Sequence, residues 1–189
     1  SRGLGDVYKR QGFKDKAPMA RRAAVQAAAS RPAQGLILPL LGLYQSTSEA
    51  DVHLLHSLRI ALRNHLRNDE WFSRLTTAEL SGEESDLLIQ LCLELKNRGA
   101  GEYIVSRLDR LAQFSARKVG EYLRFAARYI PGKSMAGVVS FSREKFEGRN
   151  EFQVELLESI RQGVEERGGA APASVRGLSL IHISEPTRR

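Results

Sequence analysis

Two histidines, His53 and His56, lie three residues apart in a segment with helical periodicity. This spacing places both imidazoles on one helix face, where they could hold a zinc ion together. A protein zinc site needs further ligands, but the same face continues with Ile60 and then with Arg63 and Arg67. Because cationic neighbours oppose a metal ion, the sequence predicts two solvated surface histidines and no metal site.

His65 and Cys92 are the other side chains with catalytic potential. His65 lies on the leucine side of the same segment, where we expect a hydrogen-bonded histidine at the edge of the core. Cys92 lies in the middle of an apolar arc, and a thiol in such surroundings behaves as a small hydrophobic side chain whose thiolate is disfavoured. We therefore predict no catalytic residue and no enzymatic activity for this chain.

The glycine pair in Gly99-Ala100-Gly101 precedes a helical segment and could suggest a loop that binds phosphate. A phosphate loop follows a strand and carries a lysine at a fixed spacing, and neither feature is present here. A connector between two helices explains these glycines better. No cofactor-binding residues are therefore predicted, and no cofactor is expected.

Basic side chains are concentrated between residues 107 and 128, where they could follow the phosphates of a nucleic acid. They are Arg107, Arg110, Arg117, Lys118, Arg124 and Arg128. Acidic residues are interspersed with them, since Glu121 shares the face of the later arginines and Asp109 lies among the earlier ones. Pairing between residues one helical turn apart accounts for most of this group. The sequence therefore argues against nucleic-acid binding, which is kept as the alternative function.

Cys92 is the only cysteine among 189 residues, so an internal disulfide and a zinc site with several cysteines are excluded. The longest apolar run, residues 36–43, is interrupted by Pro39 and Gly42 and is too short to span a bilayer. No membrane span is therefore predicted.

Helical periodicity recurs along the chain, and no segment shows the sustained alternation of a strand. The sequence predicts an all-α fold with seven or eight helices. Their expected ranges are 18–30, 36–45, 49–67, 83–97, 101–113, 116–130, 134–147 and 150–167.

Two of these helices carry clear start signals. Ser48 is a candidate N-cap with Asp51 three residues later, followed by a stripe of Leu55, Leu58, Leu62 and Leu66. Ser81 is the candidate cap of the helix 83–97, which is apolar around more than half of its circumference. A helix of this kind is expected to be enclosed by its neighbours, with Leu91 and Leu95 in the core.

Short helices joined by Gly, Pro and Ser fit either a compact bundle or stacked helical pairs. The short helix around Leu38-Pro39-Leu40-Leu41, followed by Ser48 and a long amphipathic helix, resembles one HEAT-type unit. We therefore predict a HEAT-like α-solenoid of stacked antiparallel helix pairs. In such an array the stripe Leu156, Ile160 and Val164 of the last helix would face a following unit and promote self-association.

The two ends of the chain are related through their codons. Residues 6–11 can be encoded by GAT GTG TAT AAG AGA CAG, and the opposite strand encodes Leu-Ser-Leu-Ile-His-Ile, which is residues 178–183. The relation extends outward to Ser1 on one side and to Arg188 on the other. The shared DNA resembles the transposon-end adapter used in short-read sequencing, typical of metagenomic reads. We therefore expect both ends to be adapter read-through and exclude them, with His182, from fold and site.

This origin divides the chain into three parts. Residues 1–11 and 178–189 are expected to be disordered and to contribute nothing to the fold, and residues 12–177 form a fragment of a larger protein. Its core is expected at about 36–168, because the Ala-rich residues 19–29 suit either a helix or a connector and the composition after 168 is linker-like. Without the adapter-derived residues, 24 basic and 20 acidic residues remain of 29 and 22, and the net charge falls from +7 to +4.

Residues 54–67 and residues 153–168 resemble the helical-repeat region of large bacterial membrane-bound dehydrogenase-like proteins with a c-type haem-binding domain. Members of that family join a sugar-dehydrogenase-like propeller, HEAT-like repeats and a terminal haem domain. No Cys-x-x-Cys-His haem attachment motif occurs in this sequence, so none of the family's redox residues is carried over. The resemblance implies a scaffold segment of a protein exported from the cytoplasm, for example to the periplasm.

The expected function is therefore a non-catalytic scaffold or protein-protein interaction segment. Its expected partners are neighbouring domains of the parent chain or another protein. Two other functions stay open, namely a basic HEAT-like module that binds nucleic acid and an enzyme built on a helical bundle. An enzyme would require a concave pocket with converging polar groups.

Overall fold

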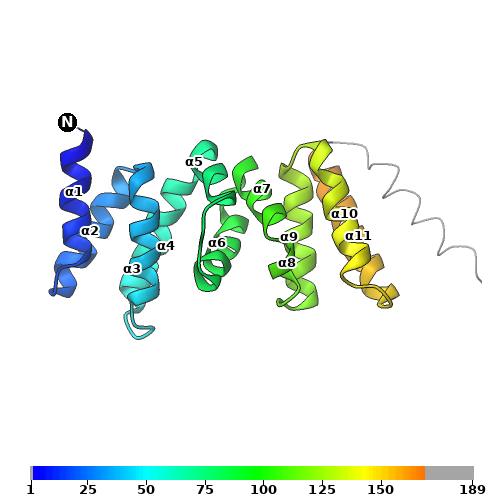
Figure 1. The fold of residues 1–189 in the computed structure, drawn as a ribbon, viewed down its shortest axis with the longest axis horizontal. Coiled ribbons are helices and arrows are strands. Elements are labelled where there is room, and N and C mark those ends of the chain that lie inside the picture. The colour runs from blue at the N-terminus through cyan, green and yellow to red at the C-terminus, as the bar shows by residue number, and fades with distance from the viewer. Residues whose placement is uncertain (1, 169–189) are drawn as a thin grey trace, which may run out of the picture. The chain divides into compact units, whose positions relative to one another are not determined.

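The structure of the chain, a computed structural model, describes residues 2–168 (Figure 1). The expected linker after residue 168 and the expected adapter-derived segment 178–189 lie outside the described residues. The described part contains eleven α-helices, three short 3-10 helices and no strand, so the predicted all-α class is confirmed there. None of the helices in this part is long and apolar enough to cross a membrane.

The chain divides into two compact units, Ser1–Leu95 and Lys96–Arg189, called unit 1 and unit 2 below. Unit 1 contains α1 (Arg2–Phe13), α2 (Pro18–Ser30), α3 (Ile37–Ser46), α4 (Val52–Leu66), α5 (Asp69–Ser73) and α6 (Gly82–Leu95). Unit 2 contains α7 (Arg98–Ser106), α8 (Leu108–Leu111), α9 (Ala116–Tyr129), α10 (Met135–Glu144) and α11 (Asn150–Glu166).

Most predicted helices occur close to their predicted positions. The segment 101–113 forms two helices, α7 and α8, which meet at Arg107. The Ala-rich segment is helix α2, whose Val25 and Ala28 are fully buried, so the core begins before residue 36. The five-residue helix α5 was not predicted, because one and a half turns show no periodicity.

Helix α1 corrects the expectation of disorder at residues 1–11, because Arg2–Phe13 form an α-helix. That residues 1–11 add nothing to the stability of the fold stays a prediction. Helix α1 packs against α2 and α3 within unit 1. Lys9 donates a hydrogen bond to the carbonyl oxygen of Arg31, and Arg10 donates one to that of Gly35. Residues with good helix propensity, such as Lys9, Arg10 and Gln11, allow this helix to form whatever the origin of its sequence.

The core of unit 1 is built from leucine-rich faces of α3, α4 and α6. Helix α4 contacts α2, α3 and α6. Of its predicted apolar stripe, Leu58, Leu62 and Leu66 are completely buried. Leu55 is only half-buried, and Leu54 is buried in its place. Helix α4 begins later than predicted. Its N-cap is Asp51, whose carboxylate accepts a hydrogen bond from the Leu54 backbone N–H at 3.1 Å.

Helix α6 confirms its predicted start and its central place in the core of unit 1. The Ser81 hydroxyl accepts a hydrogen bond from the Glu84 backbone N–H, and the Glu84 carboxylate accepts one from the Ser81 N–H, at 3.1 and 2.8 Å. This reciprocal pair is a capping box. Leu91 is fully buried and Leu95 is nearly so, as predicted.

In unit 2, α9 packs against α7 on one side and α11 on the other, and α10 also contacts α11. The prediction that Gly99 and Gly101 form a connector between two helices is wrong, because both lie in the first turn of α7, which Asn97 caps through the Ala100 N–H. A Cβ atom on Gly101 would lie 3.1 Å from the Ile130 side chain. The absence of a side chain at Gly101 therefore lets the start of α7 approach the end of α9.

The predicted exposure of the apolar stripe on α11 is also wrong. Leu156, Ile160 and Val164 are at most 1% exposed within the chain itself. Helix α9 covers them, because Gly163 allows the backbone of α9 to approach at Arg124. Self-association through this stripe would require unit 2 to open.

Candidate functional site

The residues that could do chemistry do not converge. His53 and His56 both lie on the exposed face of α4, and no cluster of three or more His, Cys, Asp or Glu side chains suited to a metal ion occurs within residues 2–168. Cys92 is fully buried in α6, and burial raises the pKa of its thiol well above the ordinary value. The reactive thiolate form is therefore suppressed.

His65 is fully buried rather than at the edge of the core. Its Nδ1 lies 2.7 Å from the carbonyl oxygen of Ala61, and since a carbonyl only accepts, Nδ1 carries the proton. Its Nε2 is buried without a hydrogen-bond partner among the described residues. Burial lowers the pKa of His65, opposed in part by the Ala61 hydrogen bond, so the neutral imidazole is the stable form.

Three basic residues of α9, Arg117, Arg124 and Arg128, are paired with acidic ones. Arg124 and Arg128 of α9 both bind the carboxylate of Glu166 in α11, the latter at 3.3 Å. Hydrogen bonding by Arg124 lowers the pKa of Glu166. Arg117 lies 3.7 Å from Glu121, which is the pairing within one helix that the sequence predicts. The pairing with Glu166 could not be read from the sequence, because the two helices are far apart along it.

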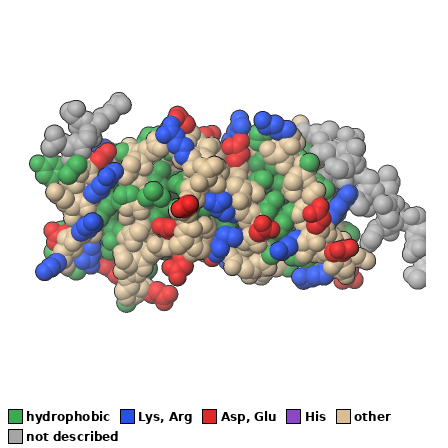
Figure 2. Space-filling view, viewed as in Figure 1, with side chains coloured by type: hydrophobic (Ala, Val, Ile, Leu, Met, Phe, Trp, Pro, Cys, Tyr) green, Lys and Arg blue, Asp and Glu red, His purple; other side chains and the backbone are tan. Residues whose placement is uncertain are grey.

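Within each unit, charged side chains of both signs are interspersed on the side drawn in Figure 2. No continuous basic area is visible on that face. A protein that tracks phosphates needs cations without competing carboxylates nearby. The geometry therefore does not favour nucleic-acid binding through Arg124 and Arg128.

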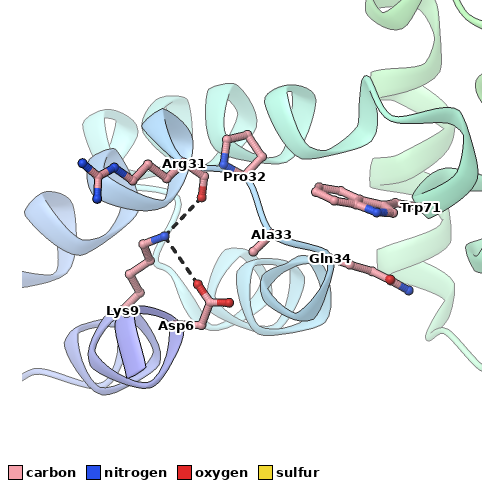
Figure 3. A pocket seen from close by; sticks show the side chains of 8 residues that line it. Asp6, Lys9, Arg31, Pro32, Ala33, Gln34 and Trp71 are labelled. Atoms are coloured by element: carbon pink, nitrogen blue, oxygen red, sulfur yellow. Dashed lines mark hydrogen bonds and ion pairs between the residues drawn. The ribbon is translucent and has the colours of Figure 1, made fainter. Parts of the chain in front are cut away.

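A pocket of about 620 Å³ lies in unit 1 (Figure 3). One wall is α1, with Gly5, Asp6 and Lys9, and the opposite side carries Trp71 of α5. The floor is the segment that joins α2 to α3. It contributes Arg31, Pro32, Ala33 and Gln34.

The polar groups of this pocket bind one another. Lys9 lies 3.5 Å from the carboxylate of Asp6 and donates to the Arg31 carbonyl oxygen at 3.1 Å, as the dashed lines in Figure 3 show. The other side of the pocket is the indole of Trp71 and the ring of Pro32. A lysine, a carboxylate and an apolar wall could hold a small ligand loosely, but they do not form a nucleophile with its base.

A second hollow of about 460 Å³ lies in unit 2 between α9 and α11. Arg117, Glu121 and Arg124 line one side, and Glu155 and Gln162 line the other. Arg117 binds Glu121 and Arg124 binds Glu166, so these side chains already have partners. The hollow is a shallow polar groove between two packed helices.

Sequence reasoning missed the pocket beside Trp71. The tryptophan is the only one in the chain, which was a usable signal, but its position beside α1 depends on a helix that was expected to be disordered. Comparison with known proteins found no matching family model, no matching curated protein and no matching solved structure.

Proposed function

We propose that this chain is a non-catalytic helical scaffold, or interaction segment, of a larger multidomain protein. The observation that carries the proposal is the order of packing within each unit. In unit 1, α2 contacts α4 and α4 contacts α6; in unit 2, α7 contacts α9 and α9 contacts α11. This order of contacts supports the proposal, because alternate helices also contact one another in the stacked helical pairs of a HEAT-like solenoid.

The chemistry of the helices agrees with a scaffold. Large apolar side chains are used in contacts between helices, and charged side chains form pairs between neighbouring helices. Arg59 and Arg63 of α4 both approach Glu94 of α6, at 3.1 and 3.7 Å. Such pairs on exposed helices add little stability but fix which helix faces which. Packing and orientation are the properties that a spacer between domains requires.

The parent protein is proposed from the resemblance described above. It would be a dehydrogenase-like protein with a haem domain, located outside the cytoplasm, in which this segment separates domains or presents a surface to a protein partner. In the same proposal, residues 1–11 and 178–189 come from adapter DNA and not from that parent.

Determining the genomic DNA around the codons of residues 12–177 tests this proposal. We expect the reading frame to continue on both sides with codons unrelated to those of residues 1–11 and 178–189, and to encode a Cys-x-x-Cys-His motif downstream. Genomic codons for residues 6–11 directly before Gly12 would contradict the adapter origin. A continuous frame without a haem motif or a dehydrogenase-like domain would contradict the proposed parent.

A further inference from the structure

Within α1, Phe13 is buried, but residues 6–9 have the opposite pattern to that expected of a helix that packs on a core. The apolar residues Val7 and Tyr8 are 51% and 66% exposed. The charged residues Asp6 and Lys9 point toward α2 and α3, with side chains only 26% and 14% exposed. A helix selected for this position would place apolar side chains inward and charged ones outward.

The pocket beside Trp71 lies between α1, residues 31–34 and Trp71, where no side chain of α1 occupies the space. Gly5 lines that pocket, and a Cβ atom added to Gly5 would meet no atom within 4 Å. The opposite walls, Pro32, Ala33 and the indole of Trp71, are apolar. The hollow is open to solvent, because Gly5, Pro32 and Gln34 are exposed, so a larger side chain from a docked helix has room to cover its apolar wall.

Elsewhere the surface under α1 matches a helix closely. A Cβ atom on Gly12 would lie 2.6 Å from the Cβ of Ala24, so the two helices touch at that point. The carbonyl oxygens of Arg31, which follows the last turn of α2, and of Gly35 both accept hydrogen bonds from α1. The contact at Gly12 therefore places the axis of a helix close to α2, whereas the absence of a side chain at Gly5 leaves the pocket open.

We propose that the surface formed by α2, residues 31–35 and Trp71 is a docking site for an amphipathic helix with large apolar side chains where α1 has Gly5, Asp6 and Lys9. The occupant is a helix of the parent protein, and α1 takes its place in this chain. This inference rests on the proposed scaffold and on the adapter origin of residues 1–11. The pocket beside Trp71 is then an unfilled helix contact and not a site for a small molecule.

Filling the pocket in the full chain tests the proposal. Gly5→Leu places an apolar side chain toward Pro32 and Trp71, and Gly5→Ala is the matched control, because Ala and Leu have similar helix propensities. We expect the leucine variant to melt about 2–4 °C above the alanine variant, as about 1 kcal/mol of added burial gives in a protein of this size. Gln11→Leu, on the exposed face of α1, should leave the melting temperature unchanged.

The fluorescence of Trp71 reports on the pocket itself, since the chain has no other tryptophan. In Gly5→Leu, but not in Gly5→Ala or Gln11→Leu, we expect emission at shorter wavelength and weaker quenching by acrylamide. Equal melting temperatures and unchanged Trp71 emission for the leucine and alanine variants would overturn the docking site. That outcome is separate from failure of the proposed function, which the genomic DNA decides.

Discussion

The carbonyl oxygen of Arg124 in α9 occupies the place where a side chain on Gly163 of α11 would begin. The same position on Gly163 lies 2.9 Å from the Cβ of Ala127, so backbone and side chain of α9 both close against it. Two helices can approach this closely only where one of them has no Cβ atom. The pairing of α9 with α11 therefore depends on Gly163.

Replacing Gly163 with alanine should destabilise unit 2 by about 1–3 kcal/mol, because the new methyl group must push α11 away from α9. Gly137 is the matched control, since it also lies within a helix, α10, and its added Cβ would meet nothing within 4 Å. Gly137→Ala should stabilise the chain slightly, by up to about 1 kcal/mol. Urea unfolding measures both, and equal effects of the two substitutions would contradict the close contact at Gly163.

Leu91→Ala should cost roughly 2–5 kcal/mol, the range for truncating a fully buried leucine. Leu38→Ala, in α3 of the same unit, should cost less than about 0.5 kcal/mol, because Leu38 is 54% exposed. Chemical denaturation of the two variants beside the wild type gives the comparison. A cost below about 0.5 kcal/mol at Leu91 would show that α6 is not the centre of the core.

Unit 1 should lose stability as the pH falls below about 6.5, the ordinary pKa of a histidine. Burial lowers the pKa of His65 in the folded state. Below pH 6.5 the histidine is therefore protonated in the unfolded chain while it is still neutral in the folded chain. The contribution of His65 to the free energy of unfolding is complete when the pH lies above the pKa of the unfolded state. It decreases as the pH falls below that pKa, and it stops changing once the pH is below the lowered pKa of the folded state.

The urea midpoint between pH 8 and pH 5 measures this loss for His65. We expect a flatter pH dependence in His65→Gln than in the wild type. Leu62→Ala is the control for destabilisation alone, because it keeps His65 and should keep the wild-type slope. The same slope in His65→Gln and the wild type would assign the pH dependence to other groups.

Glu166→Gln should lower the stability of unit 2 by less than about 1 kcal/mol, because the carboxylate that binds Arg124 and Arg128 is close to solvent. Arg124 lowers the pKa of Glu166, so this contribution is present above its ordinary pKa of 4.5 and is lost as the pH falls through the lowered value. Added salt should reduce the contribution of these ion pairs to the stability of unit 2, because it screens charges close to solvent. Urea midpoints at low and high salt test this, and an effect of Glu166→Gln that salt does not reduce would speak against ion pairing.

The positions of most helices could be predicted from the sequence, because their apolar residues recur with helical spacing and some carry cap residues such as Ser81. The first residue of a helix was harder to predict than its approximate position. Ser48 and Asp51 are both good caps, and only the geometry of the turn decides between them. The sequence predicts a connector at Gly99 and Gly101, since glycine disfavours helices, but close contact between α7 and α9 outweighs that preference.

Contacts and ion pairs between helices that are distant in sequence could not be predicted. The contact of Gly163 with α9 and the pairing of Arg124 with Glu166 depend on how two helices distant in sequence are rotated about their axes. The pocket beside Trp71 was missed for a different reason. The expected adapter origin of residues 1–11 predicts disorder. A helix nevertheless forms there from local propensity and packs on the surface beside it.

Hydrogen exchange under native conditions, compared between the wild type and Leu91→Ala, tests the proposed stacking of helices most directly. In a stacked array each helix is stabilised by its neighbours, so damage in α6 should spread unevenly. We predict the largest loss of protection in α6, a smaller loss in α4, which contacts α6, and the smallest in α2, which packs on α4. An equal loss in α2, α4 and α6 would show that unit 1 opens as one closed domain and would contradict the scaffold of stacked pairs.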